Sequence, residues 1–391
     1  MKRKKVSELA KQIRGVSYKT EDLHENLDEN SVTLLRANNI FEGRINFDDV
    51  VYVDKSRVAR EQYLCKGDIL VCASSGSKQL VGKAASFNFD TECTFGAFCK
   101  VVRPNQDVAN YLSMYFQSNA YRRKISEVAI GANINNIRNE HIDALELPIG
   151  SNAENEKVVA SFSLLQQIID GRKQQLHKLD ELIKSRFIEL FGSISEEVPL
   201  SYYIAGLNAG KSLAGEEENH NKVLKTGAAT YDYFDATQIK NLPIDYEPQE
   251  SHRVKAGDVI ISRMNTAELV GAAAYVWDVP EHIYLPDRLW RADVKETANP
   301  IFVWQVLIQS STKESIRRIA SGTSGSMKNI SKLGLLGIRV VKAPINLQQQ
   351  FAAFVEQTDK SKYYSSLSFR YCQAAENAYR QEWITCRTSD F

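Results

Sequence analysis

The chain has 391 residues, with 49 Lys and Arg against 48 Asp and Glu, so its formal net charge is +1 at pH 7. Apolar residues make up 43% of it and charged residues 25%, which is an ordinary composition for two or three globular domains. No apolar run is long enough for a membrane span and Met1-Lys2-Arg3-Lys4-Lys5 leads into polar residues, so we expect a cytoplasmic protein without membrane contact. Any binding of nucleic acid would need local basic patches.

Residues 1–150 read as a mixed α/β module. Short β-like runs such as Ile69-Leu70-Val71-Cys72 and Phe98-Cys99-Lys100-Val101-Val102 are separated by Gly, Asn and Asp turns. A helix is expected from Asn110 to Val128. The six cysteines form no C-x-x-C pair and the six histidines are scattered, so the sequence predicts reduced structural thiols and no metal site.

Residues 151–195 have the period of a long helix. Their apolar positions step by four and three alternately, which is typical of the seam of a coiled coil, and only two of the positions are charged. These positions are Val158, Phe162, Leu165, Ile169, Arg172, Leu176, Leu179, Ile183, Arg186 and Leu190.

Residues 196–345 repeat the first module at an offset near 190 residues. They contain the strand-like run Val259-Ile260-Ile261-Ser262 and an expected helix near Ile301 to Ile319. Several short segments of the first module return here: Val6-Ser7-Glu8-Leu9 as Val198-Pro199-Leu200-Ser201, Gly67-Asp68-Ile69-Leu70 as Gly257-Asp258-Val259-Ile260, Leu80-Val81-Gly82 as Leu269-Val270-Gly271, Asn136-Ile137 as Asn329-Ile330, and Leu147-Pro148 as Ala343-Pro344.

Residues 346–391 hold a second long helix with a more polar seam and a C-terminal tail. Its seam positions are Phe351, Val355, Thr358, Lys362, Ser365, Phe369, Cys372, Glu376, Tyr379 and Trp383. A helix of roughly 35 residues is about 50 Å long, which is more than a module of this size needs. We therefore expect the two helices to form an antiparallel coiled coil between two similar modules, with a pseudo-twofold axis. The alternative is two unrelated amphipathic helices, each packed on its own module.

Two segments resemble motifs of enzymes. Ala205 to Gly210-Lys211-Ser212 matches a relaxed phosphate-loop pattern, but the acidic stretch after Leu213 is a poor start for the helix that such a loop requires. Asn299-Pro300-Ile301-Phe302 lacks the second proline of the step with which adenine methyltransferases hold a flipped base. Neither segment predicts catalysis.

The duplicated steps resemble the specificity subunits of type I restriction-modification systems, and the resemblance covers nearly the whole chain. It implies two target recognition domains, spacer helices and no catalytic activity. It also implies binding to double-stranded DNA, to two methyltransferase subunits and to restriction translocase subunits. S-adenosylmethionine would then belong to the methyltransferase partner. Polar Lys362, Ser365 and Ser366 depart from the family's Leu/Ile seam.

Candidate DNA contacts lie in the turns of each module. Lys and Arg bind phosphates, Arg pairs with guanine, and Asn or Gln pairs with adenine. In the first module the candidates are Arg36, Asn38, Asn39, Ser75, Ser77, Lys78, Asn133, Asn135, Asn136 and Arg138; in the second they are Lys225, Thr226, Arg263, Asn265, Thr266, Ser326, Lys328 and Asn329. Each also has an ordinary interpretation, because Asn, Ser and Gly are turn residues.

Three functions follow as hypotheses. The first is a non-catalytic subunit that recognises a bipartite DNA target with one half-site per module. The second is a complete DNA methyltransferase or endonuclease, which would require a cofactor-binding sheet. The third is a scaffold for proteins, which would show no salt-dependent binding to DNA.

Overall fold

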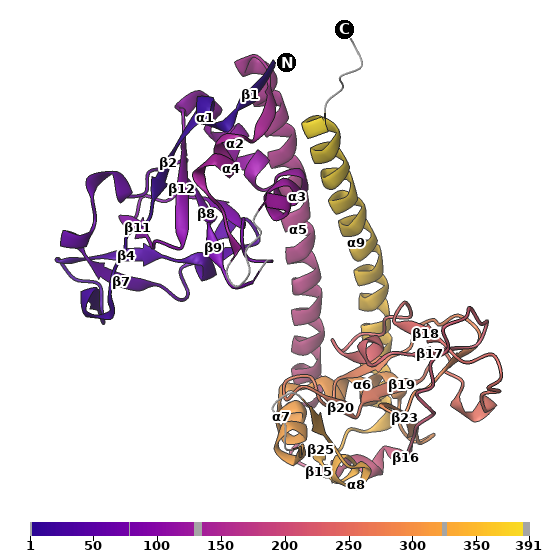
Figure 1. Cartoon of the computed structure of the whole chain (residues 1–391). Helices are drawn as coiled ribbons and strands as arrows, with labels where there is room; N and C mark the ends of the chain where they lie inside the picture. Colours follow the sequence, from indigo (N-terminus) through magenta and orange to yellow (C-terminus); the bar gives the residue numbers. More distant parts are fainter. Residues whose placement is uncertain (1, 78, 129–134, 323–326, 386–391) are drawn as a thin grey trace. The chain divides into compact units, whose positions relative to one another are not determined.

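The computed structural model describes residues 2–77, 79–128, 135–322 and 327–385 (Figure 1). The chain divides into two compact units: unit 1 is Met1–Gln174 with Ser366–Phe391, and unit 2 is Gln175–Ser365. Both boundaries fall inside long helices, α5 (Asn152–Phe191) and α9 (Ile345–Thr385). Each unit therefore contains part of both helices. Among the described residues, no helix combines the length and the apolar character needed to cross a membrane.

Unit 1 is built on two four-stranded sheets. In the first, β12 (Cys99–Pro104) is antiparallel to β8 (Ile69–Cys72) and to β2 (Ala10–Arg14), and the order is β10-β8-β12-β2. In the second, β11 (Cys93–Phe95) is parallel to β4 (Ser31–Leu35), and the order is β11-β4-β7-β3. The remaining strands and helices are β1 (Lys2–Lys5), α1 (Val6–Leu9), β3 (Leu23–His24), β5 (Ile40–Phe41), β6 (Arg44–Ile45), β7 (Val51–Asp54), β9 (Ser74–Ser75), β10 (Ala84–Ser86), α2 (Ala109–Phe116), α3 (Asn119–Val128), β13 (Asn135–Asn136), α4 (Asn139–Asp143) and β14 (Glu146–Ile149).

Unit 2 repeats this topology. The order β21-β19-β23-β16 matches β10-β8-β12-β2, and in the sheet β18-β17-β22 the pair β17/β22 is parallel, as β4/β11 is. The elements are β15 (Glu197–Pro199), β16 (Ile204–Asn208), β17 (Lys222–Leu224), β18 (Ile239–Asn241), β19 (Val259–Ser262), β20 (Met264–Asn265), β21 (Ala273–Tyr275), β22 (Ile283–Tyr284), β23 (Leu289–Val294), α6 (Pro300–Ile308), α7 (Ser310–Ile319), β24 (Lys328–Asn329), α8 (Lys332–Leu336) and β25 (Arg339–Val341). The predicted mixed α/β fold with an internal repeat is confirmed.

The repeated Gly-Asp step forms the turn that starts the central strand of each unit. The carboxylate of Asp68 accepts a hydrogen bond of 2.8 Å from the backbone N–H of Cys65, and Asp258 does the same from Lys255 at 2.8 Å. Asp68 is buried and also accepts two hydrogen bonds from Arg103, at 2.8 and 2.7 Å. A buried carboxylate is stable only when its oxygens are paired in this way.

The repeated Leu-Val-Gly step brings a backbone turn against a helix. Gly82 and Gly271 have φ of +80° and +79°, and a Cβ placed there would lie 2.6 Å from Ile125 Cγ2 and 2.3 Å from Ile316 Cγ2. Both the left-handed φ and the close approach require a residue without a side chain. The equivalence of these positions explains why the motif occurs twice.

Two of the expected correspondences between the modules are wrong in register. The backbone N–H of Val6 donates to Leu145 O at 2.9 Å, and that of Leu200 donates to Ile338 O at 2.8 Å. Val6 therefore corresponds to Leu200 rather than Val198. By the same pairing Leu147 corresponds to Val340 rather than Ala343. The similarity of these short sequence segments suggested the wrong register, because the β-pairing, and not the position of the proline, determines which residues correspond.

The two single helices expected at 110–128 and 301–319 are each a pair. α2 ends at Phe116 and α3 begins at Asn119, because the hydroxyl of buried Ser118 accepts a hydrogen bond of 3.2 Å from Tyr121 N. In unit 2, Gln309 between α6 and α7 has extended backbone angles, with φ −60° and ψ 142°. The sequence shows neither break, since neither site contains Gly or Pro.

The predicted seams of α5 and α9 are confirmed where the structure describes their side chains. All ten positions of α5 and the positions from Phe351 to Tyr379 of α9 are buried or half-buried, whereas Trp383 lies outside the described side chains. In unit 2, Phe191 packs 5.5 Å from Phe351 between ring centroids, and Asp180 pairs with Lys362 at 2.6 Å. The later residue of α5 contacts the earlier residue of α9, so the two helices are antiparallel within unit 2.

Candidate nucleic-acid interface

A two-stranded ribbon brings two of the predicted segments of unit 1 together. β9 and β13 pair antiparallel, with Ser75 opposite Asn135 and Ser74 opposite Asn136. The next residue, Ile137, is fully buried and donates its N–H to Ala73 O at 2.8 Å, which anchors the ribbon to the sheet. Asn136 is exposed, so its amide is available to a partner.

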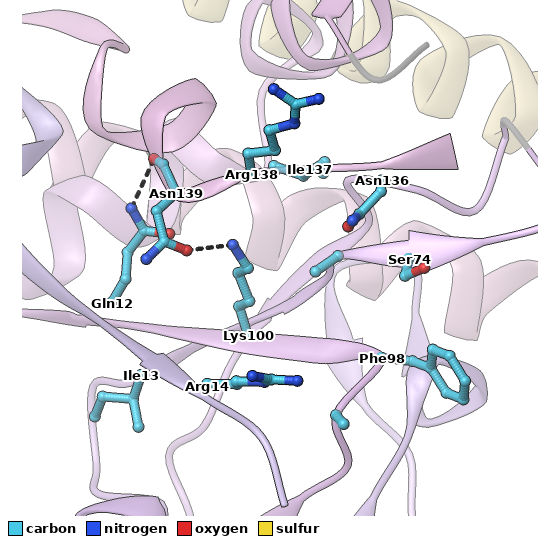
Figure 2. A pocket seen from close by; sticks show the side chains of 12 residues that line it. Gln12, Ile13, Arg14, Ser74, Phe98, Lys100, Asn136, Ile137, Arg138 and Asn139 are labelled. Carbon is cyan, nitrogen blue, oxygen red and sulfur yellow. Dashed lines mark hydrogen bonds between the residues drawn. The ribbon is translucent and has the colours of Figure 1, made fainter. Parts of the chain in front are cut away.

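The ribbon borders a cleft of about 630 Å³ that combines cations, amides and one aromatic ring (Figure 2). Arg14 and Lys100 lie directly opposite each other on the neighbouring strands β2 and β12. Like charges in this arrangement destabilise a sheet, and an anionic partner would relieve the repulsion. The polar side chains and the ring that line the cleft are Gln12, Arg14, Ser74, Phe98, Lys100, Asn136, Arg138 and Asn139.

Hydrogen bonds hold the inner wall of this cleft in place. Gln12 donates to Asn139 O at 2.9 Å, and Lys100 donates to the side chain of Asn139 (Figure 2). Gln12 also donates to the carboxylate of Asp143 at 2.7 Å. The Gln12 Oε1 atom is buried without a hydrogen-bond partner. Burial lowers the pKa of Lys100, and Arg14 adds to this effect while Asp143 opposes it.

A second cleft, of about 440 Å³, adjoins the first and shares Ser74, Ala97 and Phe98 with it. It contains two of the predicted residues, Arg36 and Asn38, which both contact Asp49: Arg36 forms an ion pair at 3.0 Å and Asn38 donates at 2.5 Å. The structure thus brings the predicted segments at 36–38, 74–75 and 136–138 to one surface.

Asn39 is placed differently. It is 1% exposed, and its amide already donates to Asn46 O at 2.9 Å and to Asp49 O at 3.0 Å. It therefore serves as a loop residue in this structure. Among the other candidates, Ser77 is exposed, whereas Lys78, Asn133 and Ser326 lie outside the described residues, as does the side chain of Asn135.

Unit 2 presents the equivalent ribbon with other side chains. β20 and β24 pair with Met264 opposite Asn329 and Asn265 opposite Lys328. The guanidinium of Arg263 lies 5.8 Å from the ring centroid of Trp290, and its Nε is 3.4 Å from Asn329 Oδ1. A cation over an aromatic face is held in a fixed orientation.

The remaining candidates of unit 2 take part in local contacts. Asn265 Nδ2 donates to Thr230 Oγ1 at 3.4 Å, and Thr266 N donates to Asn265 Oδ1 at 2.9 Å. Lys328 Nζ donates to Gly322 O at 3.0 Å. Lys225 is exposed and precedes Thr226, the first residue of a short 3-10 helix.

Residue-by-residue reasoning missed Gln12, Arg14, Phe98 and Lys100 of the first cleft. They lie on or beside strands, whereas the residues predicted from the sequence all belong to expected turns. The alternation of Gln12 and Arg14 with the half-buried Ile13 along β2 was the signal that could have found them.

The described residues do not bring together a metal or phosphate site of the usual kinds. No group of three His, Cys, Asp or Glu side chains within the described ranges could hold a metal ion. After Gly210 no helix begins before β17, and all residues between them are described, so this segment lacks the helix that a phosphate loop requires. Lys211 instead lies 5.8 Å from the ring centroid of Tyr246.

Comparisons with known proteins agree with the resemblance that the motifs predicted. The chain is 28% identical over 374 residues to the specificity subunit of the type I restriction enzyme EcoKI of Escherichia coli (strain K12), covering 90% of this chain and 80% of that protein. It is also 28% identical over 376 residues to the StySPI specificity subunit of Salmonella potsdam, with the same coverage. The predicted relationship is confirmed. No protein-family model matches the chain.

Solved structures agree in fold. The type I restriction-modification S subunit of M. genitalium matches with a TM-score of 0.57 at 14% identity, covering 99% of this chain and 96% of that one. A chain from a structural study of complex assembly and conformational transition of the type I R-M system matches with a TM-score of 0.53 at 14% identity, covering 98% and 97%. The fold of the whole chain is therefore that of these S subunits.

Proposed function

Because the chain is related along 90% of its length to specificity subunits of type I restriction enzymes, we propose that it is the DNA-sequence specificity subunit of such an enzyme. Each unit recognises one half of a bipartite target. The observation that carries the proposal is the pair of equivalent ribbons, β9/β13 and β20/β24, which have the same backbone pairing and different side chains. Two similar surfaces with different side chains suit two different half-sites.

The first cleft supplies both kinds of contact that DNA recognition needs. Arg14, Lys100 and Arg138 provide cations for phosphates, and the amide of the exposed Asn136 matches the edge of an adenine. These contacts are local, as the net charge of +1 requires.

In this proposal the chain is not an enzyme. It recruits methyltransferase subunits, two for each chain because it contains two equivalent units, and through them restriction translocase subunits. S-adenosylmethionine is bound by the methyltransferase partner. The complex acts in the cytoplasm, where its DNA substrate is found. The relationship to subunits of restriction enzymes supports assembly with other subunits; the internal repeat supports the number of two.

The test is to express the chain with a methyltransferase subunit and to map modified adenines across the host genome. We expect one bipartite motif with a fixed gap. In purified form, the complex should bind that motif more tightly than other DNA, and binding should weaken with salt. A genome without any bipartite motif, together with salt-independent binding, would contradict the proposal and favour a protein scaffold.

A variant with two substitutions examines the cleft itself. Arg14→Ala combined with Lys100→Ala should weaken binding to all sequences about equally and reduce the slope of log affinity against log salt by about two. Lys19→Ala is the matched control, because Lys19 is 74% exposed, pairs with Glu21 at 3.1 Å and is not among the residues that line either cleft. Unchanged binding by the double variant would remove the cleft from the interface.

A further inference from the structure

Phe98 is 70% exposed, although hydrogen bonds hold its backbone in place. The carbonyl oxygen of Phe98 accepts two hydrogen bonds, from Ala73 N at 2.9 Å and from Ser74 N at 3.0 Å. Strand β12 begins at the next residue. The ring is therefore presented to solvent from a fixed backbone position, where only its side-chain torsions remain free.

The surroundings of Phe98 are polar and basic. It lines both clefts of unit 1, so Arg14 and Asn136 lie toward one side and Arg36 and Asn38 toward the other. Figure 2 shows Phe98 at one end of the first cleft, beside Ser74, with Gln12 at the other end. The exposed ring thus lies where the two polar clefts meet, so a partner bound in either cleft would contact it.

The equivalent residue of unit 2 is Arg288. Cys99 pairs with Cys72 in unit 1 and Leu289 pairs with Ser262 in unit 2, so the residues before them correspond. The carbonyl of Arg288 accepts a hydrogen bond of 3.1 Å from Arg263 N, as that of Phe98 does from Ala73 N. Arg288 is exposed, and the described part of the chain offers it no ion-pair partner. One backbone position thus presents a phenyl ring in unit 1 and a guanidinium in unit 2.

We infer that residues 98 and 288 are a pair of specificity-determining residues, each of which contacts one base pair of its own half-site. This inference rests on the proposed function. A phenyl ring has no hydrogen-bonding group, so Phe98 contacts the thymine C5-methyl group in the major groove. A guanidinium matches the N7 and O6 acceptors of guanine, so Arg288 reads a guanine.

The experiment uses the complex of the full chain with a methyltransferase subunit and begins with the mapped target. Oligonucleotides carry uracil in place of each thymine of the target in turn, or 7-deazaguanine in place of each guanine. For the wild type, loss of one methyl contact should weaken binding roughly fourfold at one thymine. Loss of N7 at one guanine of the other half-site should weaken it by about tenfold.

The variants show whether these effects come from the two residues. With Phe98→Ala the uracil effect should disappear while the 7-deazaguanine effect stays, and with Arg288→Ala the reverse should hold. Leu27→Ala and Lys255→Ala are controls. Leu27 is 57% exposed and lines neither cleft. Lys255 comes before the first residue of β19, whereas Arg288 lies near the last residue of that strand. Both controls should keep both effects.

The outcomes separate this inference from the proposed function. If the wild type marks a bipartite target but the variants keep both analogue effects, or if the thymine effect and the guanine effect fall in the same half-site, the inference is wrong and the function stands. A wild type that marks no bipartite target overturns both. Phe98→Leu, which retains an apolar side chain, should keep part of the uracil effect, and thermal unfolding of each variant shows whether it is folded.

Discussion

At the scale of single residues, the turn at Gly271 illustrates how a backbone conformation and a close contact act together. A Cβ at Gly271 would meet Ile316 Cγ2 at 2.3 Å, where φ is +79°. We expect Gly271→Ala to reduce the free energy of unfolding by about 2 to 4 kcal/mol, from strain plus displacement of the buried Ile316. Urea denaturation followed by circular dichroism measures this loss.

Two other glycines separate the two causes. Gly257 has φ +95° with open space around it, so Gly257→Ala should cost only the strain, about 1 kcal/mol. Gly171 lies in helix α5 with nothing within 4 Å, so Gly171→Ala should stabilise by up to about 1 kcal/mol. Equal losses for Gly257→Ala and Gly271→Ala would show that the contact with Ile316 has no effect.

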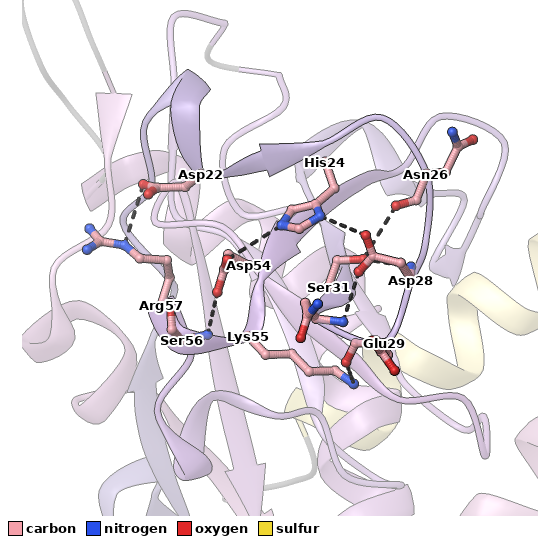
Figure 3. A network of polar contacts seen from close by, with 11 residues as sticks. Asp22, His24, Asn26, Asp28, Glu29, Ser31, Asp54, Lys55, Ser56 and Arg57 are labelled. Atoms are coloured by element: carbon pink, nitrogen blue, oxygen red, sulfur yellow. Dashed lines mark hydrogen bonds and ion pairs between the residues drawn. The ribbon is translucent and has the colours of Figure 1, made fainter.

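A polar network around His24 makes part of unit 1 sensitive to pH (Figure 3). His24 lies on β3, with Nδ1 2.9 Å from Asp28 and Nε2 3.5 Å from Asp54. The hydrogen bond with Asp28 holds the pKa of His24 above its ordinary value of 6.5. The pKa of Asp28 is lowered from 3.8, mainly by His24, and that of Asp54 is lowered from 3.8, mainly by Ser56.

The signs define the pH window. A raised histidine pKa stabilises the fold fully below pH 6.5, and this contribution is lost as the pH rises through the folded value. The lowered carboxyl pKa values contribute above pH 3.8 and lose their effect as the pH falls through the folded values. The difference in Tm between the wild type and His24→Ala should therefore be largest between these two pH values and shrink toward pH 8.

His177→Ala serves as the control for that pH series. His177 is 73% exposed, and its Nδ1 lies 3.5 Å from the carboxylate of Glu181. Its substitution should leave Tm unchanged at each pH. A His24→Ala difference that stays constant from pH 4 to pH 8 would contradict the assignment of the network.

The residues of the candidate site were only partly predictable from the sequence. Ser75, Asn136 and Arg138 were found because turn residues of this kind occur in both modules. Phe98 was recognised only as part of a β-like run, since its exposure depends on the hydrogen bonds that fix residues 73 and 74. Asn39 has the right chemistry for DNA, but its amide is used within its own loop, and the sequence gives no sign of this.

At the scale of elements, the seam of α9 contains polar side chains that are tolerated because they are paired. Thr358 is 7% exposed, and its hydroxyl donates to Phe354 O of the same helix at 2.8 Å. Lys362 lies between Asp180 at 2.6 Å and Asp359 at 3.7 Å. Burial raises the pKa of Asp359, and Lys362 counteracts that rise.

An apolar residue at position 362 should therefore destabilise the seam even though it fits a coiled-coil pattern. Lys362→Met leaves Asp180 and Asp359 without their shared cation, and we expect a loss of about 1 to 2 kcal/mol in thermal or urea unfolding. Lys360→Met is the control, because Lys360 is 70% exposed and its pair with Glu356 contributes at most about 0.5 kcal/mol. A stabilised Lys362→Met variant would mean that the ion pairs do not matter.

The elements themselves were predicted to different degrees. The heptad steps predicted both long helices and their buried faces, because a helical period of seven residues is a strong and local signal. The breaks within the helices at 110–128 and 301–319 depend on a single capping hydroxyl at Ser118 and on the backbone of Gln309. Each break is made by a single residue, so the periodicity of the apolar positions does not reveal it.

At the scale of the whole molecule, the repeat was readable because its motifs form turns with strict backbone needs. The register of the strand pairs β1/β14 and β15/β25 was not readable from the sequence, because each pair joins segments more than a hundred residues apart. The local amino-acid sequence does not determine which strands pair over that separation along the chain.

If the paired helices set the gap between half-sites, lengthening them should lengthen the gap. We propose inserting one heptad after Gln174 in α5 and another after Ser365 in α9, the two points where the units divide. Seven residues add about 10 Å of helix and preserve the seam. The methylated motif should then gain about three base pairs in its gap, at about 3.4 Å each, with both half-sites unchanged.

Insertion of two residues at the same points is the control. It turns the seam away from its partner by about 200°, so it should lower Tm instead of changing the gap in a regular way. An unchanged gap after the heptad insertion would show that the helices do not determine it, and altered half-site bases would show that the units do not read DNA independently.

The backbone of the two ribbons has a consequence for how such a protein evolves. The positions held by Ser74 and Phe98 in unit 1 are held by Met264 and Arg288 in unit 2, and in both units main-chain hydrogen bonds fix these partly or fully exposed positions. Stability at these places is therefore largely independent of the side chain. New side chains can accumulate there without loss of the fold, so a change of target sequence does not require a compensating mutation elsewhere.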